Sequence, residues 1–179
     1  EKRHHVNVKR AEGLGKNTGL VCSETVNSHL EADCAVRHLV SGEAVQTLRA
    51  VEGGLETELE FDLREGQWTS VRKYAVFCDS RRYNHPAEDA LALLEQACQK
   101  PVSYWYASQE AYLEEFWNHS AIEIEGDEEL NLSLHYNLYG LIQSAGKDSC
   151  CSIGAKGLSG EGYEGHYFWD TEMYIVPFF

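Results

Sequence analysis

Residues 55–63 read LETELEFDL. Leucine, threonine and phenylalanine occupy the odd positions, whereas glutamate and aspartate occupy the even positions. Successive side chains of a β-strand point to opposite faces of its sheet, so this pattern predicts a strand with one apolar face and one acidic face. Residues 64–67, Arg-Glu-Gly-Gln, are predicted to form the turn that follows.

Similar short apolar stretches recur through residues 1–80, separated by glycine, asparagine and serine. Residues 68–78 predict a strand that is covered on both faces, because large side chains fall at odd and at even positions. Weaker strands are expected at residues 6–9, 32–40 and 45–51. The first part of the chain is therefore predicted to be β-structure.

The period of the apolar residues changes at Pro86, a residue type that is favoured in the first turn of a helix. The spacing predicts helices at about residues 86–99 and 103–118. A third helix is predicted to begin after Asp127, with leucines at every third or fourth position. Strands followed by helices indicate an α+β chain in which the two kinds of element are segregated.

Residues 146–165 contain six glycines and are predicted to form a long structured loop rather than a helix. Loops of this length are uncommon inside compact domains and tend to be functional. A helix start is predicted directly after the loop, with Asp170 at or near its N-cap.

The charge of the chain restricts its partners. Fifteen basic residues against 29 acidic residues give a formal net charge of −14. This charge repels polyanions and anionic membrane surfaces, which excludes most nucleic-acid binders, but it does not repel a small neutral polyol. No run approaches the roughly 20 consecutive apolar residues of a membrane helix, and no export signal is recognised, so a soluble cytoplasmic protein is predicted.

Six cysteines are present, but none forms a CxxC pair or has a histidine at the spacing of a zinc site. No metal site is therefore expected. Four of the cysteines lie in strand-like or helical patterns and are predicted to be buried thiols rather than disulfides: Cys22, Cys34, Cys78 and Cys98.

Both ends of the sequence favour a piece of a longer protein. The only methionine is Met173, so no initiator residue is present. The last residues, 174–179, are an apolar run that would expose aromatic surface unless more protein covered it.

Trp169 and Asp170 are the candidate ligand-binding residues. Aromatic faces cover the apolar side of a pyranose ring, and a fixed carboxylate accepts hydrogen bonds from adjacent hydroxyls, so this pair suits a sugar. Taken singly, each residue fits a structural role better: Phe168 and Trp169 as core aromatics, Asp170 as a helix cap and His166 as a partly buried histidine.

Residues 157–172, GLSGEGYEGHYFWDTE, closely resemble the segment that opens the catalytic domain of glycoside hydrolase family 65. Residues 122–130 and 136–138 resemble the linker helices of that family. The β-rich first half resembles the later strands of the family's N-terminal sandwich.

The resemblance implies a fold in three parts. Residues 1–83 would be the end of an antiparallel, super-sandwich-like β-sandwich, and residues 84–145 would be linker helices. Residues 146–179 would be the first element of an (α/α)6 catalytic barrel.

The resemblance also implies an inverting α-glucoside phosphorylase that cleaves a glucose disaccharide with inorganic phosphate as co-substrate and without a cofactor. Trp169 and Asp170 match the positions that bind glucose in the −1 subsite, and Phe168, Thr171 and Glu172 would support them. The general acid, a glutamate, is expected downstream, so this chain alone is expected to contain no catalytic residue and to be inactive.

Three alternatives remain open at the sequence level. An acid trehalase of the same family would use water in place of phosphate. A non-catalytic carbohydrate-binding sandwich and a structural or interaction domain are the other two. The linkage cleaved and the acceptor sugar are not specified by the sequence, and a homodimer is compatible with it.

Overall fold

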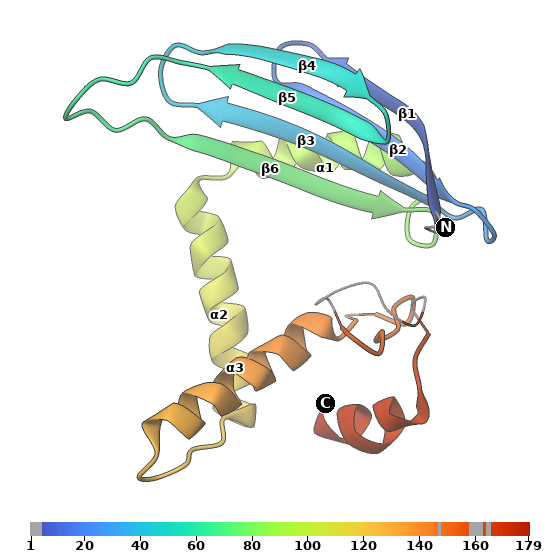
Figure 1. Cartoon of the computed structure of the whole chain (residues 1–179), viewed down its shortest axis with the longest axis vertical. Coiled ribbons are helices and arrows are strands. Elements are labelled where there is room, and N and C mark those ends of the chain that lie inside the picture. Colours follow the sequence, from blue (N-terminus) through green and yellow to red (C-terminus); the bar gives the residue numbers. More distant parts are fainter. Residues whose placement is uncertain (1–4, 147, 158–162, 164–165) are drawn as a thin grey trace. The chain divides into compact units, whose positions relative to one another are not determined.

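The computed structural model describes residues 5–146, 148–157, 163 and 166–179. Within these residues, β-strands come first and α-helices follow (Figure 1). Internal contacts divide the chain into two compact units, residues 1–105 and 106–179, and each is described by itself below.

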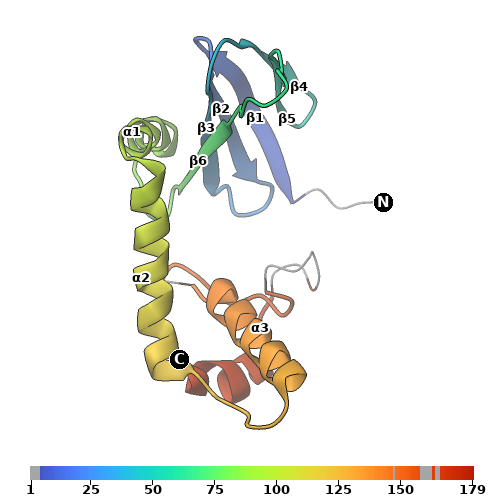
Figure 2. The same cartoon turned by 90° about the vertical axis from the view of Figure 1, so that its left-hand side faces the viewer.

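Four antiparallel strands form the main sheet of the first unit, in the order β1-β2-β3-β6, and two more form a separate hairpin. Their bounds are β1 Val6–Leu14, β2 Thr18–Thr25, β3 Glu31–Val40, β4 Val45–Val51, β5 Gly54–Glu60 and β6 Val71–Asp79. The β4–β5 hairpin and helix α1 (Pro86–Gln99) lie on opposite faces of the main sheet (Figure 2).

Two glycines let the β4–β5 hairpin approach the sheet closely. A Cβ atom on Gly19 would collide with the side chain of Leu55, and one on Gly13 would lie 3.0 Å from the Cβ atom of Leu48. The hairpin therefore packs its leucines directly against the backbone of β1 and β2.

Helix α1 covers the other face of the sheet and completes the core of this unit. Ala90 and Leu94 of α1 are fully buried together with Leu20, Ala35 and Cys78 of the sheet. Burying one leucine side chain stabilises a fold by roughly 1.5–3 kcal/mol. The bounds of α1 agree with the predicted helix, which confirms the signal given by Pro86 and the helical spacing.

Arg37 joins three elements at the edge of this core. Its Nε atom donates to the Thr18 hydroxyl at 2.9 Å, and its Nη1 atom donates to the Glu95 carboxylate at 2.7 Å. Strands β2 and β3 are thereby tied to α1 through one side chain.

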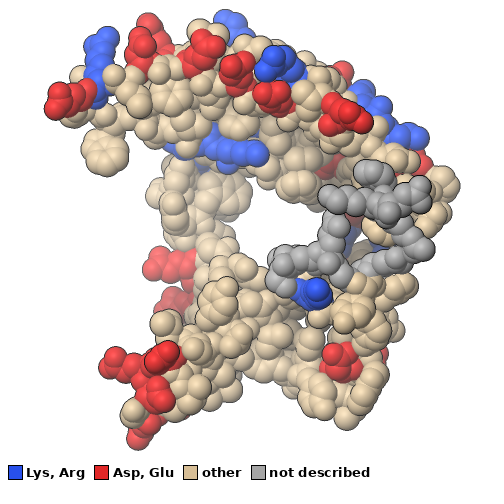
Figure 3. All heavy atoms as spheres, in the orientation of Figure 1, with Lys and Arg blue, Asp and Glu red and all other residues tan. Residues whose placement is uncertain are grey.

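The predicted alternation of β5 is confirmed. Leu55, Thr57 and Leu59 are partly buried, whereas the glutamates between them are exposed. Figure 3 shows carboxylate side chains over the hairpin, with lysine and arginine side chains among them. The Nη2 atom of Arg49 in β4 lies 3.2 Å from the Glu56 carboxylate of β5. The strand ends at Glu60, three residues earlier than predicted.

The prediction that residues 68–78 are covered on both faces is wrong for the described chain. Strand β6 begins at Val71, and Trp68 lies outside it with 99% of its surface exposed. Even-numbered residues such as Tyr74 and Val76 face α1, whereas Phe77 on the other face is 76% exposed. The cause is that the β4–β5 hairpin packs against β1 and β2 and leaves this part of β6 uncovered.

No bounds were predicted for strand β2, although Cys22 was placed in a strand-like pattern, and β1 extends to Leu14 rather than ending at Lys9. In β2 the apolar residues Leu20, Val21 and Cys22 are consecutive rather than alternating, and Gly19 precedes them. Both faces of β2 are covered, by α1 and by the hairpin, so its sequence shows no period of two.

Helices α2 (Val102–Ser120) and α3 (Glu128–Ser144) follow, and the border between the two units lies within α2. The Asp127 side chain accepts a hydrogen bond from the Leu130 backbone at 2.9 Å, which caps α3 where its start was predicted. The Trp117 ring of α2 lies 5.3 Å from the His135 ring of α3.

The second unit ends in a π-helical turn, Thr171–Ile175, and a 3₁₀ turn, Val176–Phe178. The Phe178 ring packs edge-on against Phe116 of α2, with ring centroids 6.3 Å apart. The described part of the predicted glycine-rich loop contains no β-strand and no α-helix. Residues 158–162 and 164–165 of that loop lie outside the described residues.

Candidate functional site

Asp170 directly precedes the π-helical turn, as predicted, but it does not cap it. Its backbone is already helical, with φ −63° and ψ −26°, and its side chain makes no capping hydrogen bond. A capping residue normally has an extended backbone, which lets its side chain turn back to the helix. The exposed carboxylate is therefore not used by the helix.

The side chains around Asp170 differ sharply in exposure. Trp169 is 70% exposed, and Phe168 is also exposed, so neither is a core aromatic residue in this chain. Thr171, the first residue of the turn, is only 9% exposed, whereas Glu172 is exposed. The indole of Trp169 and the carboxylate of Asp170 are thus both exposed, whereas the next residue, Thr171, is buried.

Successive backbone hydrogen bonds hold the chain around this pair. The Phe168 ring packs edge-on against Tyr163, with centroids 5.1 Å apart. The His166 backbone donates to the Tyr163 carbonyl at 2.9 Å, and the Thr171 backbone donates to the Phe168 carbonyl at 2.9 Å. The His166 carbonyl in turn accepts from the Ala155 backbone at 3.4 Å, which links this segment to residues 153–157.

A hollow of about 590 Å³ lies between α3 and residues 153–157. At one end of this segment, Gly157 packs directly against Ser144 of α3. Gly157 has a positive φ of +54°, and a Cβ atom there would collide with the Ser144 hydroxyl. The lining carries hydroxyl, amide and ammonium groups, from Tyr136, Tyr139, Asn137, Gln143 and Lys156. Ile175, from the turn that follows Trp169 and Asp170, also lines the hollow.

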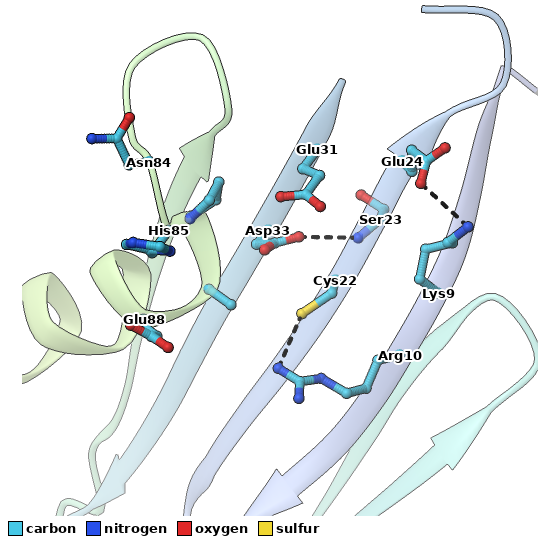
Figure 4. Close-up of a pocket in the computed structure, with 12 residues that line it drawn as sticks. Lys9, Arg10, Cys22, Ser23, Glu24, Glu31, Asp33, Asn84, His85 and Glu88 are labelled. Carbon is cyan, nitrogen blue, oxygen red and sulfur yellow. Dashed lines mark hydrogen bonds and ion pairs between the residues drawn. The ribbon is translucent and has the colours of Figure 1, made fainter. Parts of the chain in front are cut away.

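A second hollow, of about 350 Å³, lies in the first unit between the start of α1 and strands β1 to β3 (Figure 4). Arg10, Cys22 and Asp33 are register partners on three neighbouring strands, so their side chains share one face. Arg10 donates to the Cys22 sulfur at 3.6 Å, and Asp33, only 5% exposed, accepts from the Ser23 backbone at 3.2 Å.

Sequence reasoning missed this second hollow. Its residues come from β1, β2, β3 and the start of α1, and no short motif links them. The available signal was an aspartate, Asp33, inside a predicted strand, where a charged side chain is uncommon unless it has partners.

The thiols of the first unit are in poorly solvated positions. Burial raises the pKa of Cys22, although the hydrogen bond from Arg10 opposes this shift. Burial also raises the pKa of Cys34 and of Cys78. Cys78 is buried, and Cys22, Cys34 and Cys98 are partly buried, as hydrophobic thiols would be.

Metal-ion clusters and membrane-spanning helices are both absent from the part of the chain that the structure describes. No three histidine, cysteine or acidic side chains there are grouped so that they could hold a metal ion. No helix there combines the length and the apolar character that crossing a membrane requires.

Two family models match the chain. Residues 1–116 match the glycosyl hydrolase family 65 N-terminal domain, and residues 135–179 match the glycosyl hydrolase family 65 central catalytic domain. The first match covers all six strands and α1. It confirms the predicted fold class, a partial N-terminal sandwich followed by helices.

Known phosphorylases are similar to most of the chain. An alpha,alpha-trehalose phosphorylase of Geobacillus stearothermophilus is 37% identical over 158 residues, which is 88% of this chain and 20% of the relative. One of Thermoanaerobacter brockii is 33% identical over 175 residues, which is 96% of this chain and 22% of the relative.

A kojibiose phosphorylase of Caldanaerobacter subterraneus subsp. tengcongensis is 51% identical over 70 residues, which is 38% of this chain and 9% of the relative. The chain spans about a fifth of the length of the two trehalose phosphorylases. Because one family model alone matches more than half of its residues, the chain belongs to glycosyl hydrolase family 65.

Proposed function

We propose that the protein carrying this chain is an inverting α-glucoside phosphorylase that converts a glucose disaccharide and inorganic phosphate into β-glucose 1-phosphate and glucose. The observation that carries the proposal is the similarity to trehalose phosphorylases over 88% and 96% of the chain. Trehalose and kojibiose are the first candidate substrates, because the relatives named above are phosphorylases of these two sugars.

In the proposed reaction, a phosphate oxygen attacks the anomeric carbon from the side opposite the leaving oxygen. The bond from carbon to phosphate oxygen forms while the glycosidic bond breaks, so an α-linked glucose becomes a β-linked phosphate. A protonated carboxylic acid gives its proton to the leaving oxygen, and phosphate arrives already ionised, so no base is needed to activate it. We place that acid outside this chain.

Trp169 and Asp170 are assigned to glucose binding. The exposed indole would cover the apolar face of the sugar ring, and the Asp170 carboxylate, which the helix does not use, would accept from ring hydroxyls. Phe168 and Thr171 would support the pair through the Tyr163 ring contact and through burial. Glu172, one residue further along the turn, would be a neighbour of the bound sugar.

No cofactor takes part in this proposal, and inorganic phosphate is the second substrate. The expected partners are therefore small molecules, with no nucleic acid and no membrane, and the expected compartment is the cytoplasm. A homodimer remains a proposal to be checked by the mass of the whole protein in solution.

To test the proposed activity, the whole protein is incubated separately with trehalose, kojibiose, maltose and nigerose, each with and without phosphate. We expect β-glucose 1-phosphate from at least one sugar, and only when phosphate is present. Release of glucose at the same rate without phosphate would instead indicate a hydrolase of the acid trehalase kind. No product from any of the four sugars would contradict the proposal.

A further inference from the structure

The cysteines of the second unit form an adjacent pair, Cys150 and Cys151, which the site described above does not use. The pair follows α3 and precedes residues 153–157, which line the hollow beside that helix. Cys150 is partly exposed, and Cys151 is exposed.

A tight turn presents the two thiols. The Cys150 backbone donates to the Asp148 carboxylate at 2.7 Å, and the Cys151 backbone donates to the Asp148 carbonyl at 3.2 Å. A Cβ atom on Gly146 would collide with the Cβ atom of Cys151, and it would lie 3.2 Å from the Cys151 sulfur. The turn is thus closed by Asp148 and packed against a residue that has no side chain.

We propose that Cys150 and Cys151 form a reversible redox site, a vicinal dithiol that hydroperoxides oxidise and that trivalent arsenicals chelate. The inference does not depend on the proposed function, because it rests on the two thiols and their turn alone.

The oxidation is balanced with hydrogen peroxide as the oxidant. One thiolate attacks a peroxide oxygen, the O–O bond breaks, and a sulfenic acid forms with release of water. The neighbouring sulfur then attacks the sulfenic sulfur, the S–O bond breaks, and a disulfide forms with release of a second water. Two thiols are oxidised, and one peroxide is reduced.

Geometry makes this disulfide easy to reduce again. Consecutive Cα atoms are about 3.8 Å apart across a trans peptide. An ordinary disulfide joins Cα atoms about 4.4–6.8 Å apart, so a bond between neighbours is strained. Strained and exposed disulfides are the labile ones, which favours a reversible modification over a structural crosslink.

The sheet cysteines of the first unit are placed differently. Strand β3 lies between the strands of Cys22 and Cys78, so these residues are two strand spacings apart, about 9.5 Å. Cys34 pairs with Phe77 on the opposite face of the sheet. Burial raises the pKa of all three thiols, which lowers their thiolate fraction at neutral pH.

The oxidation state of the pair can be measured from the mass of a single tryptic peptide. Trypsin releases residues 148–156, DSCCSIGAK, a peptide that contains both cysteines of the pair and no other. After mild treatment with hydrogen peroxide and then iodoacetamide, we expect this peptide to be lighter than its reduced form by two hydrogen atoms and to carry no alkyl group. Dithiothreitol before alkylation should restore two alkylation sites.

The matched controls are Cys150→Ser and Cys151→Ser, each of which keeps one thiol. Neither variant should yield the peptide that has lost two hydrogens. The proposal is overturned if peroxide leaves both thiols open to alkylation while Cys98 is oxidised, or if a single variant shows the same loss as the wild type.

A second measurement needs no variant. Phenylarsine oxide, a trivalent arsenical, should bind with one arsenic per chain and protect both cysteines of the 148–156 peptide from alkylation. Excess dithiothreitol should remove it. Protection of other cysteines instead of this pair would overturn the proposal independently of any effect of a substitution on folding.

Discussion

At the scale of single residues, Gly157 shows how closely residues 153–157 follow α3. Its φ is +54°, and a Cβ atom would collide with the Ser144 hydroxyl. We therefore expect Gly157→Ala to lower the free energy of unfolding by about 1 kcal/mol or more, from backbone strain and from the collision. Urea denaturation monitored by circular dichroism measures the change.

Gly154→Ala is the matched control for this prediction. Among the described residues, a Cβ atom there would meet only the Gly157 carbonyl, at 3.9 Å, and no positive φ constrains Gly154. Its effect should stay within about 0.5 kcal/mol. Equal effects of the two substitutions would show that residues 153–157 do not depend on the contact with Ser144.

The carboxylate of Asp170 can be tested without disturbing the fold, because it makes no capping hydrogen bond. In the whole protein, Asp170→Asn should lower kcat/KM by about 100-fold or more, since each hydrogen bond to a charged group contributes about 1.5–3 kcal/mol. The melting temperature should change little. Glu129→Gln, an exposed acid in the first turn of α3, is the control, and near-normal turnover of Asp170→Asn would reject the assignment.

His38 of β3 connects stability to pH. Burial lowers its pKa, with a smaller contribution from Lys73, and its Nδ1 atom is buried without a hydrogen-bond partner among the described residues. The folded state therefore holds the neutral ring, and the unfolded chain takes up the proton first as pH falls below about 6.5. The contribution of the neutral His38 ring to the free energy of unfolding is therefore fully present above that pH. It is lost as the pH decreases towards the pKa of His38 in the folded state.

Replacing the titrating ring tests this linkage. Denaturation curves of the wild type and of His38→Gln, recorded between neutral pH and pH 5, should show a smaller loss of stability on acidification for the variant. Curves that fall in parallel would show that His38 does not couple to folding.

At the scale of elements, Arg37 links β2, β3 and α1, and its two partners differ in exposure. Glu95 is largely exposed, so Glu95→Gln should cost no more than about 1 kcal/mol. Arg37→Met also leaves the buried Thr18 hydroxyl without its donor and should cost about 1–3 kcal/mol. A double-mutant cycle in urea gives the coupling between Arg37 and Glu95, and equal costs for both single variants would contradict the role of Thr18.

The helices and strands differ in how well they could be predicted from the sequence. Helix α1 could be predicted to its ends, because Pro86 and an apolar stripe mark it locally. Strand β5 could be predicted because only one of its faces is buried. The bounds of strand β2 could not be predicted, since cover on both faces removes the alternation, and the exposure of Phe77 depends on where a distant hairpin packs.

The residues of the candidate sites could likewise be predicted only where the signal is local in the sequence. Trp169 and Asp170 could be selected from their side-chain chemistry, but taken singly each fitted a structural role better, as a core aromatic and a helix cap, until a family resemblance favoured a sugar. The hollow around Asp33 could not be predicted, because register across three strands brings its residues together.

At the scale of the whole molecule, the chain carries the proposed glucose-binding pair but not the proposed general acid. We therefore expect the isolated chain to form no β-glucose 1-phosphate from trehalose or kojibiose, while the whole protein does. A coupled assay for glucose 1-phosphate, run at equal molar concentrations, makes the comparison. Turnover by the isolated chain would mean that one of its own carboxylates serves as the acid.

The close packing of the β4–β5 hairpin on Gly13 and Gly19 limits which substitutions the first unit can accept. Because Leu48 and Leu55 of the hairpin lie against these two glycines, a methyl group added at Gly19 would require the Leu55 side chain to move, and one added at Gly13 would press on the Cβ atom of Leu48. We therefore expect substitutions at Gly13 and Gly19 to be tolerated less well than changes to the exposed glutamates of the hairpin.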